Sequence, residues 1–140
     1  MPTLNDPATI RRLVTTPSRW AVVGLSANPE RPAYGVAQTL QRLGHEIVAV
    51  HPRAEPVHGA PAVATVGEVP GHVDVVDLFV NSARAGGVVD EAIAAGAGAV
   101  WLQLGVVDEA AATRALAAGL DVVMDRCPAI EAGRLGLLRG

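Results

Sequence analysis

Short runs of apolar residues alternate along the chain with segments whose apolar positions recur at helical spacing. Five of the runs are continuous rather than alternating, which is typical of strands buried on both faces. These predicted strands cover residues 20–25, 46–50, 73–80, 99–104 and 120–124. The segments with helical spacing predict helices at about 34–43, 82–96 and 108–119, and a short helix before the first strand.

Capping residues support these boundaries. Asp6 and Pro7 are an N-cap and a first-turn proline, and Asn81 and Asp108 can cap the two later helices. Residues 54–72 hold several prolines and have no strong period, so we expect a small extended segment and one short helical turn there.

The alternation of strands and helices predicts the α/β class, as a Rossmann-like doubly wound parallel sheet of five strands. With the strands numbered in chain order, the expected order is 3-2-1-4-5, which places residues 20–25 beside 99–104. Such sheets bind ligands outside the carboxyl ends of the strands, where the strand order reverses. Segments 24–34 and 103–108 follow the two strands at this point.

Composition narrows the class of protein. The 140 residues are enough for one domain, residues 1–140, of which 1–18 form an N-terminal helix and loop. Half of the residues are hydrophobic but only 3% are aromatic, so we expect an aliphatic core. The net charge of −3 argues against a nucleic-acid-binding module, and no run is long enough to span a membrane. A single cysteine and the lack of a secretory signal favour a cytoplasmic location.

The loop after the first strand carries groups that bind anions. Only Gly24 stands where the dinucleotide-binding fingerprint has three glycines. Ser26 and Asn28 are hydrogen-bond donors beside a predicted helix N-terminus, and Arg31 is held between two prolines. A phosphate could lie here; the alternative is a stiff surface loop with a solvated arginine. Tyr34 either contacts a ligand or packs against the protein.

The end of the second strand has a cation where an NAD site has an acid. An acidic side chain would hold the ribose hydroxyls of NAD, but His51, Pro52 and Arg53 stand there instead. An arginine attracts a nucleotide with a phosphate on its adenosine ribose. NADP and coenzyme A both carry such a phosphate, and the residues leave both possible.

Several short motifs occur together in this chain. They are Gly-Leu-Ser at 24–26, Asn-Pro at 28–29, Arg-Pro at 31–32, His-Pro at 51–52, Val-Trp-Leu-Gln-Leu-Gly at 100–105, Met-Asp-Arg-Cys at 124–127 and Ile-Glu at 130–131. In this combination the chain resembles the small stand-alone CoA-binding proteins, which are similar to the CoA-binding domain of succinyl-CoA synthetase. The resemblance runs from about the first helix to Leu135.

The resemblance implies a single CoA-binding domain that holds coenzyme A across the carboxyl ends of the strands, with loop 24–34 around the phosphates. The cofactor-binding residues that it implies, together with the loops above, are Gly24, Leu25, Ser26, Asn28, Arg31, Tyr34, His51, Pro52, Arg53, Phe79, Gln103 and Gly105. The amide of Gln103 either binds the pantetheine or satisfies nearby backbone. Gly105 serves a turn or a close approach of the ligand.

The chain departs from the family pattern at three places. The family usually has Asn where this chain has His51, and frequently His where Ala132 stands. It commonly has Arg after the Phe that ends the third strand, where Val80 follows Phe79. The missing arginine bears on how tightly the phosphate-rich end of the ligand is held.

We expect no catalytic residues and no metal site. The acidic residues, Asp74 and Asp77 among them, are expected on strand and helix surfaces without metal-ligand spacing. Cys127 is expected to be a small buried thiol, with a mixed disulfide to the coenzyme as the other hypothesis.

The interpretation is a cytoplasmic protein that binds coenzyme A or an acyl-CoA, a small-molecule ligand, non-covalently and without catalysis. An NADP-dependent oxidoreductase is one alternative. The other is a regulatory subunit whose partner is an acyl-CoA enzyme.

Overall fold

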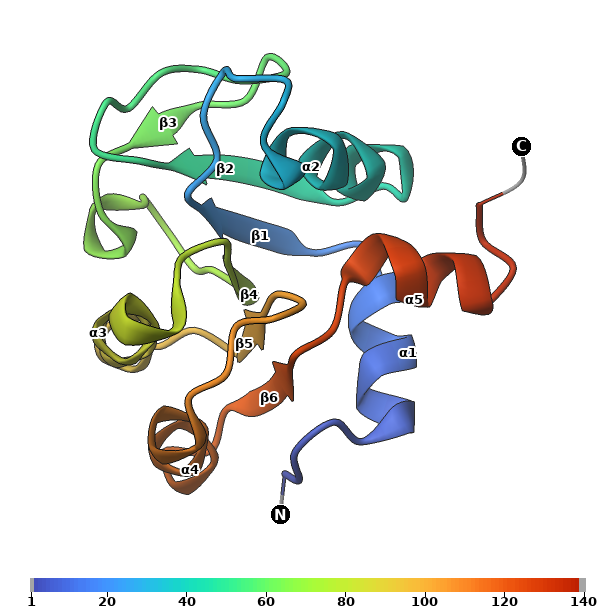
Figure 1. Cartoon of the computed structure of the whole chain (residues 1–140), viewed down its shortest axis with the longest axis vertical. Helices are drawn as coiled ribbons and strands as arrows, with labels where there is room; N and C mark the ends of the chain where they lie inside the picture. Colours follow the sequence, from blue (N-terminus) through green and yellow to red (C-terminus); the bar gives the residue numbers. More distant parts are fainter. Residues whose placement is uncertain (1, 139–140) are drawn as a thin grey trace.

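A six-stranded sheet forms the centre of the computed structural model, which describes residues 2–138 (Figure 1). The strands are β1 (Arg19–Val23), β2 (Glu46–Val50), β3 (Ala62–Val63), β4 (Val75–Leu78), β5 (Ala99–Leu102) and β6 (Asp121–Met124). Their order is β3-β2-β1-β4-β5-β6, and every neighbouring pair is parallel. The carboxyl ends of all strands therefore lie at one edge of the sheet.

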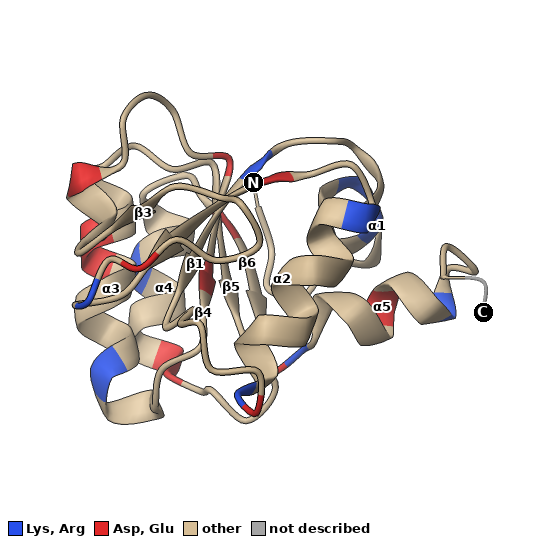
Figure 2. Ribbon diagram, turned by 90° about the horizontal axis from the view of Figure 1, so that it is seen from above, with Lys and Arg blue, Asp and Glu red and all other residues tan. Residues whose placement is uncertain are grey.

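Helices cover both faces of the sheet (Figure 2). One face packs against α1 (Pro7–Thr15), α2 (Pro32–Arg42) and α5 (Pro128–Arg134), and the other against α3 (Ser82–Ala94), α4 (Glu109–Ala117) and the 3₁₀ turn η1 (Val66–Glu68). The Rossmann-like α/β class predicted from the pattern is confirmed.

The two faces differ in the kind of core they bury. Under α3 and α4 the buried residues are aliphatic, with Met124 the sole thioether among them, as the composition predicted. The face under α1, α2 and α5 contains both tryptophans, Trp20 and Trp101, whose side chains are fully buried with ring centroids 5.6 Å apart. The indole N–H of Trp101 donates to the carbonyl of Arg126, so its polar atom is satisfied within the core.

His45 ties α1 to the sheet on this face. Its Nδ1 accepts from the backbone N–H of Ser18, so Nε2 carries the hydrogen and donates to the carbonyl of Val14, 2.9 Å away. Burial lowers the pKa of His45, which keeps the ring neutral in this arrangement.

The predicted five strands and their order are wrong in two respects. The extended segment expected within residues 54–72 is a sixth strand, β3, which pairs with β2 at the edge. β1 therefore pairs with β4 and not with β5, and residues 73–80 lie in the middle of the sheet instead of at its edge. The reason is burial: all four residues of β4 are buried, whereas β3 is short and half-buried, which suits an edge strand.

Three helices begin at the predicted N-cap residues. Side chains of Asp6, Asn81 and Asp108 each accept a hydrogen bond from the backbone N–H three residues later. Helix α5 was not predicted. It has only seven residues, and its start is marked in sequence by Pro128 at the first helical position.

One acidic residue is not where the sequence predicted it. Asp77 lies on β4 with no exposed surface, and neither carboxylate oxygen has a hydrogen-bond partner among the described residues. Burial raises the pKa of its carboxyl well above the usual range.

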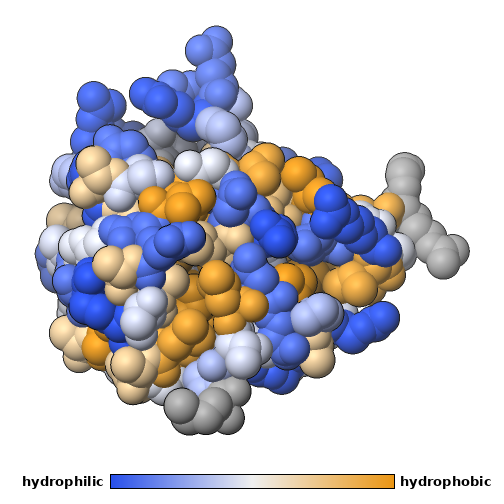
Figure 3. Space-filling model, turned by 60° about the horizontal axis from the view of Figure 1, so that its bottom comes forward, coloured by the Kyte–Doolittle hydropathy of each residue, from blue (hydrophilic) through white to orange (hydrophobic). Residues whose placement is uncertain are grey.

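The surface of the molecule is mixed in character. Figure 3 shows apolar side chains gathered between hydrophilic ones on the side that is lowest in Figure 1. No helix in residues 2–138 is long and apolar enough to cross a membrane.

Candidate functional site

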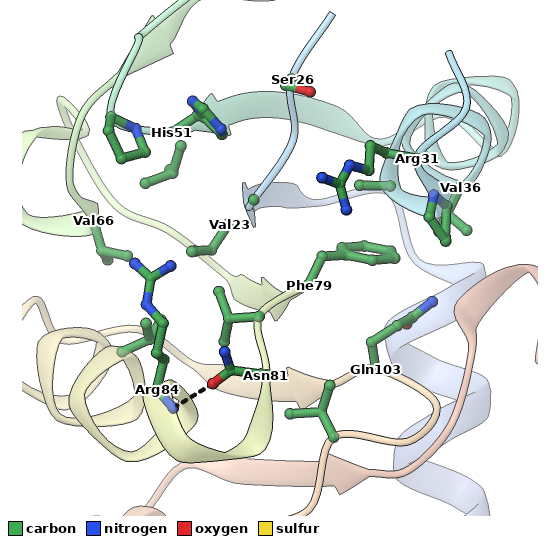
Figure 4. Close-up of a pocket in the computed structure, with 18 of the residues that line it drawn as sticks. Val23, Ser26, Arg31, Val36, His51, Val66, Phe79, Asn81, Arg84 and Gln103 are labelled. Atoms are coloured by element: carbon green, nitrogen blue, oxygen red, sulfur yellow. Dashed lines mark hydrogen bonds between the residues drawn. The ribbon is translucent and has the colours of Figure 1, made fainter. Parts of the chain in front are cut away.

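A cavity of about 1020 Å³ lies at the carboxyl edge of the sheet (Figure 4). Its floor is formed by residues that follow four strands: Gly24 after β1, His51 after β2, Phe79 after β4 and Gln103 after β5. Side chains from α2, α3 and α5 form its walls. Because β4 lies beside β1, the segment after β4 is at the centre of the cavity, where the predicted strand order did not place it.

Gly24 is required by the close approach of β1 and β4. Its φ is +94°, and a Cβ atom on it would lie 2.3 Å from the carbonyl oxygen of Phe79. The backbone N–H of Gly24 donates to Val50, and that of Phe79 donates to Val23, which holds the three strand ends together. The single glycine of this loop therefore fixes the floor of the cavity.

The loop after Gly24 is folded by its own polar side chains. Ser26 Oγ accepts from the backbone N–H of Asn28 at 3.3 Å, and Asn28 Oδ1 accepts from that of Glu30 at 3.0 Å. These bonds use acceptor atoms. The hydroxyl hydrogen of Ser26 and the amide hydrogens of Asn28 stay available to donate to a ligand.

Three arginines surround the cavity without partners. Arg31, Arg53 and Arg84 line it, and within residues 2–138 none of their guanidinium groups has a hydrogen bond or ion pair. In Figure 4 the side chain of Arg31, the residue just before α2, and that of Arg84 on α3 extend into the cavity. Elsewhere, four arginines are paired: Arg12 with Asp121, Arg19 with Glu46, Arg114 with Asp90 and Arg134 with Glu131.

The charge of the cavity is therefore opposite to that of the chain. Glu91 is the single carboxylate that lines it within the described part of the chain, against three arginines. A cavity with unpaired guanidinium groups attracts phosphate or carboxylate, because these anions accept two parallel hydrogen bonds from one arginine.

Arg84 was not among the predicted site residues. It lies in the first turn of α3, where its backbone N–H donates to Oδ1 of the N-cap Asn81 at 3.0 Å. The side chain brings a cation to the segment after β4, although Val80 stands where the family commonly has arginine. Its place in the first turn of a predicted, capped helix that follows a buried strand was the signal available in the sequence.

Gln103 holds an unsatisfied polar atom in the cavity wall. The residue is 7% exposed, and its side-chain Oε1 is buried with no hydrogen-bond partner among the described residues. No hydrogen bond in the described part of the chain joins its amide oxygen to nearby backbone, so of the two roles predicted for the side chain the structure does not support satisfaction of backbone by this atom. A buried acceptor without a donor costs about 1–3 kcal/mol, which a ligand N–H would recover.

Three of the predicted residues do not line the cavity. Leu25 is fully buried in the core beneath α2. Tyr34 packs its ring against His58 at 4.3 Å, and its carbonyl accepts from the His58 ring, which favours packing over ligand contact. Gly105 has a φ of +84° and donates its N–H to Asp125, so it serves the turn.

The remaining nine predicted residues line the cavity: Gly24, Ser26, Asn28, Arg31, His51, Pro52, Arg53, Phe79 and Gln103. Besides Arg84, the sequence did not predict the wall formed by Val66, Val80 and Asn81. Cys127 is half-buried and also lines the cavity, so the prediction of a buried thiol is wrong. Its sulfur has no hydrogen-bond partner among the described residues, including any histidine.

A metal site needs several ligand side chains that lie close together. No group of three His, Cys, Asp or Glu residues within 2–138 could hold a metal ion.

Two proteins of similar length resemble this chain over most of its residues. The uncharacterized protein YneT of Bacillus subtilis is 35% identical over 120 residues, which are 86% of this chain and 89% of that protein. Among solved structures, a hypothetical protein from Pyrococcus horikoshii has a TM-score of 0.86 at 36% identity, over 91% of this chain and 90% of that chain.

A larger enzyme contains a similar unit. Acetyl-coenzyme A synthetase 1 of Ca. Korarchaeum cryptofilum has a TM-score of 0.71 at 25% identity, over 83% of this chain but 27% of that chain. The family model described as CoA binding domain matches residues 18–133, which include every side chain of the cavity. The chain thus belongs to the CoA binding domain family.

Proposed function

We propose that this protein binds coenzyme A non-covalently in the cavity at the carboxyl edge of the sheet and catalyses no reaction itself. The observation that carries the proposal is the set of three unpaired arginines, Arg31, Arg53 and Arg84, around a cavity in a CoA binding domain. Coenzyme A carries a pyrophosphate and a ribose phosphate, which need several cations at separate places.

The arrangement of the cavity suits the rest of the coenzyme. Arg53 and His51 follow β2, so the adenosine with its ribose phosphate is assigned to that end. The pyrophosphate is assigned to Arg31 and the donors of its loop. The pantetheine then extends over β4 toward Gln103, whose buried Oε1 can accept from one of its amide N–H groups.

The absence of catalysis is proposed on the side chains that the cavity offers. His51, Glu91 and Cys127 line it, and no hydrogen bond joins any two of them in the described part of the chain. A nucleophile or general base needs such a partner to be activated.

Two other functions use the same groups. NADP also carries a ribose phosphate that Arg53 could bind, which would suit an oxidoreductase. A regulatory subunit of an acyl-CoA enzyme is supported by the acetyl-coenzyme A synthetase that contains a similar unit in a longer chain. No other lining residue of the cavity, among those that the structure describes, favours either of these two functions over coenzyme A binding.

Calorimetric titration separates these functions. Coenzyme A and acetyl-CoA are expected to bind with one site per chain, and NADP and NAD much more weakly. Saturable binding of NADP without a response to coenzyme A would contradict the proposal. Purification of the protein from its native cells in a stable complex with an acyl-CoA enzyme would favour the regulatory subunit.

A further inference from the structure

The cavity has two chemically different ends. At the β2 end stand Arg53 and His51, and Arg84 reaches in from α3. At the β5 end stand Leu104 from the β5–α4 loop and Ile130 from α5. A ligand that fills the cavity therefore has an anionic end and an end that meets apolar side chains.

Leu104 and Ile130 are unusually exposed for large apolar residues. Leu104 is 59% exposed and Ile130 is 47% exposed, and Val107, three residues after Leu104, is 44% exposed. Single exposed apolar side chains are common on proteins. Leu104 and Ile130 come from different elements and border the same cavity, so both can contact an apolar group of one ligand.

The strand order determines which part of the ligand reaches this surface. From β2 to β5 the order is β2-β1-β4-β5, so the two ends are three strand spacings, or roughly 14 Å, apart. With the phosphates at the β2 and β1 end, the thiol end of the coenzyme passes Gln103 and arrives at Leu104 and Ile130. A free thiol would leave these two side chains in water.

We propose that the preferred ligand is an acyl-CoA with a medium-length acyl chain that lies against Leu104 and Ile130, rather than free coenzyme A. This inference rests on the proposed function, because it takes the direction of the coenzyme from the arginines. The acyl chain would cover the exposed side chains of Leu104 and Ile130.

Calorimetric titration with coenzyme A and its acetyl, butyryl, hexanoyl and octanoyl thioesters tests the inference. Beyond the acetyl form, each added methylene is expected to tighten binding about twofold, half the free energy of complete burial. Octanoyl-CoA carries six more methylenes than acetyl-CoA and should then bind roughly 60-fold more tightly than acetyl-CoA.

Variants show whether these side chains cause the effect. In Leu104→Ser combined with Ile130→Ser, the affinity ratio of octanoyl-CoA to coenzyme A is expected to fall toward one. Leu4→Ser, which changes a leucine that is 42% exposed and does not line the cavity, should keep the ratio of the parent. Thermal unfolding of each variant verifies that it is folded.

The outcomes separate the inference from the proposed function. Binding of coenzyme A with no gain from the acyl chain overturns the inference and leaves the function intact. No binding of any thioester or of coenzyme A overturns the function. Light scattering that shows a dimer of the parent and a monomer of the double variant also overturns the inference, because a second copy would then cover the surface.

Discussion

The described arginines differ in what balances their charge. Four of them away from the cavity, such as Arg12, have carboxylate partners on the surface, and such pairs contribute little to stability. Others away from the cavity, such as Arg42, have no ion pair within the described residues and are exposed to solvent. Arg31, Arg53 and Arg84 have no partner within residues 2–138. Their charge is therefore available to an anionic ligand.

Arg84 provides a test of this charge, because it was absent from the predicted site. Arg84→Ala is expected to weaken coenzyme A binding by about 1.5–3 kcal/mol, the usual contribution of a hydrogen bond to a charged group. Arg31→Ala is expected to do the same. The loss should shrink at high salt, as measured by calorimetry at two ionic strengths.

Arg42→Ala is the matched control, since Arg42 lies in the last turn of α2 and does not line the cavity. Equal losses in Arg42→Ala and Arg84→Ala would show that the effect is one of net charge alone.

Substitution of Gln103 is expected to have opposite effects on the stability of the protein and on coenzyme A binding. Gln103→Leu removes a buried oxygen without a partner, so the unliganded protein should be as stable as the parent or more stable by about 1 kcal/mol. Coenzyme A should bind at least fivefold more weakly, because its amide loses an acceptor. Denaturant unfolding and calorimetry on the same variant measure both quantities. A variant that loses stability and keeps its affinity would contradict the assigned role.

Ionisation of the buried carboxyl of Asp77 is expected to make the stability of the protein depend on pH. In the unfolded chain its carboxyl ionises near pH 4, whereas burial raises the pKa in the folded chain. The contribution of Asp77 to the free energy of unfolding is therefore most favourable below about pH 4. As the pH rises from there toward the pKa of the folded chain, this contribution falls by about 1.4 kcal/mol per pH unit.

Asn at this position has no charge to bury. Asp77→Asn should be more stable than the parent at pH 7.5, and its advantage should be smaller at pH 4.5. Urea unfolding at the two values measures the difference, and an advantage that is equal at both would show that ionisation of Asp77 is not the cause.

At the scale of elements, the cavity depends on how closely β1 and β4 end beside each other. Gly24→Ala would place a Cβ against the carbonyl of Phe79 and would also strain a positive φ. We expect a loss of about 2–5 kcal/mol in the free energy of unfolding, from overpacking and from the left-handed backbone together.

Gly119→Ala isolates the second cause. Gly119 also has a positive φ, +89°, but a Cβ there meets no atom within 4 Å, so its loss should be about 1–2 kcal/mol. If the two variants lost the same stability, the contact with Phe79 would not be the constraint that requires glycine.

Two kinds of element could be predicted from the sequence: strands that form largely apolar runs, and helices that begin at a polar capping residue. The runs at 46–50 and 120–124, and the caps Asp6 and Asn81, are all present in the structure. Two elements were not fully predicted: β3 was expected as an extended segment but not as a strand of the sheet, and α5 was not expected. They have two and seven residues, too few for a period to show. Their existence depends on pairing with β2 and packing against α1 and α2, which are tertiary contacts.

The candidate site was predictable for a related reason. Residues that follow strands converge at one edge of a parallel sheet, which brought nine of the predicted residues to the cavity wall. Arg84 was missed because the strand order placed residues 73–80 at the edge, away from the centre of the site. Tyr34 was misplaced because the sequence does not show its contact with His58.

At the scale of the whole molecule, charge is distributed unevenly. The chain carries a net charge of −3, yet the lining of the cavity at the carboxyl edge carries more arginines than acids. The sheet and the two layers of helices hold four strand ends side by side. The polar groups of the site come from the loops beyond these strand ends and from α3. The fold thus concentrates positive charge at one edge of an acidic molecule.

The central claim, that coenzyme A occupies this cavity, is tested most directly by nuclear magnetic resonance of the isotope-labelled chain, whose mass is 14.3 kDa. Titration with coenzyme A is predicted to shift the backbone amide signals of Gly24, Arg31, Arg84 and Gln103 most strongly. Unchanged spectra at millimolar coenzyme A, or shifts confined to the opposite edge of the sheet around Thr16 and Gly98, would contradict the account.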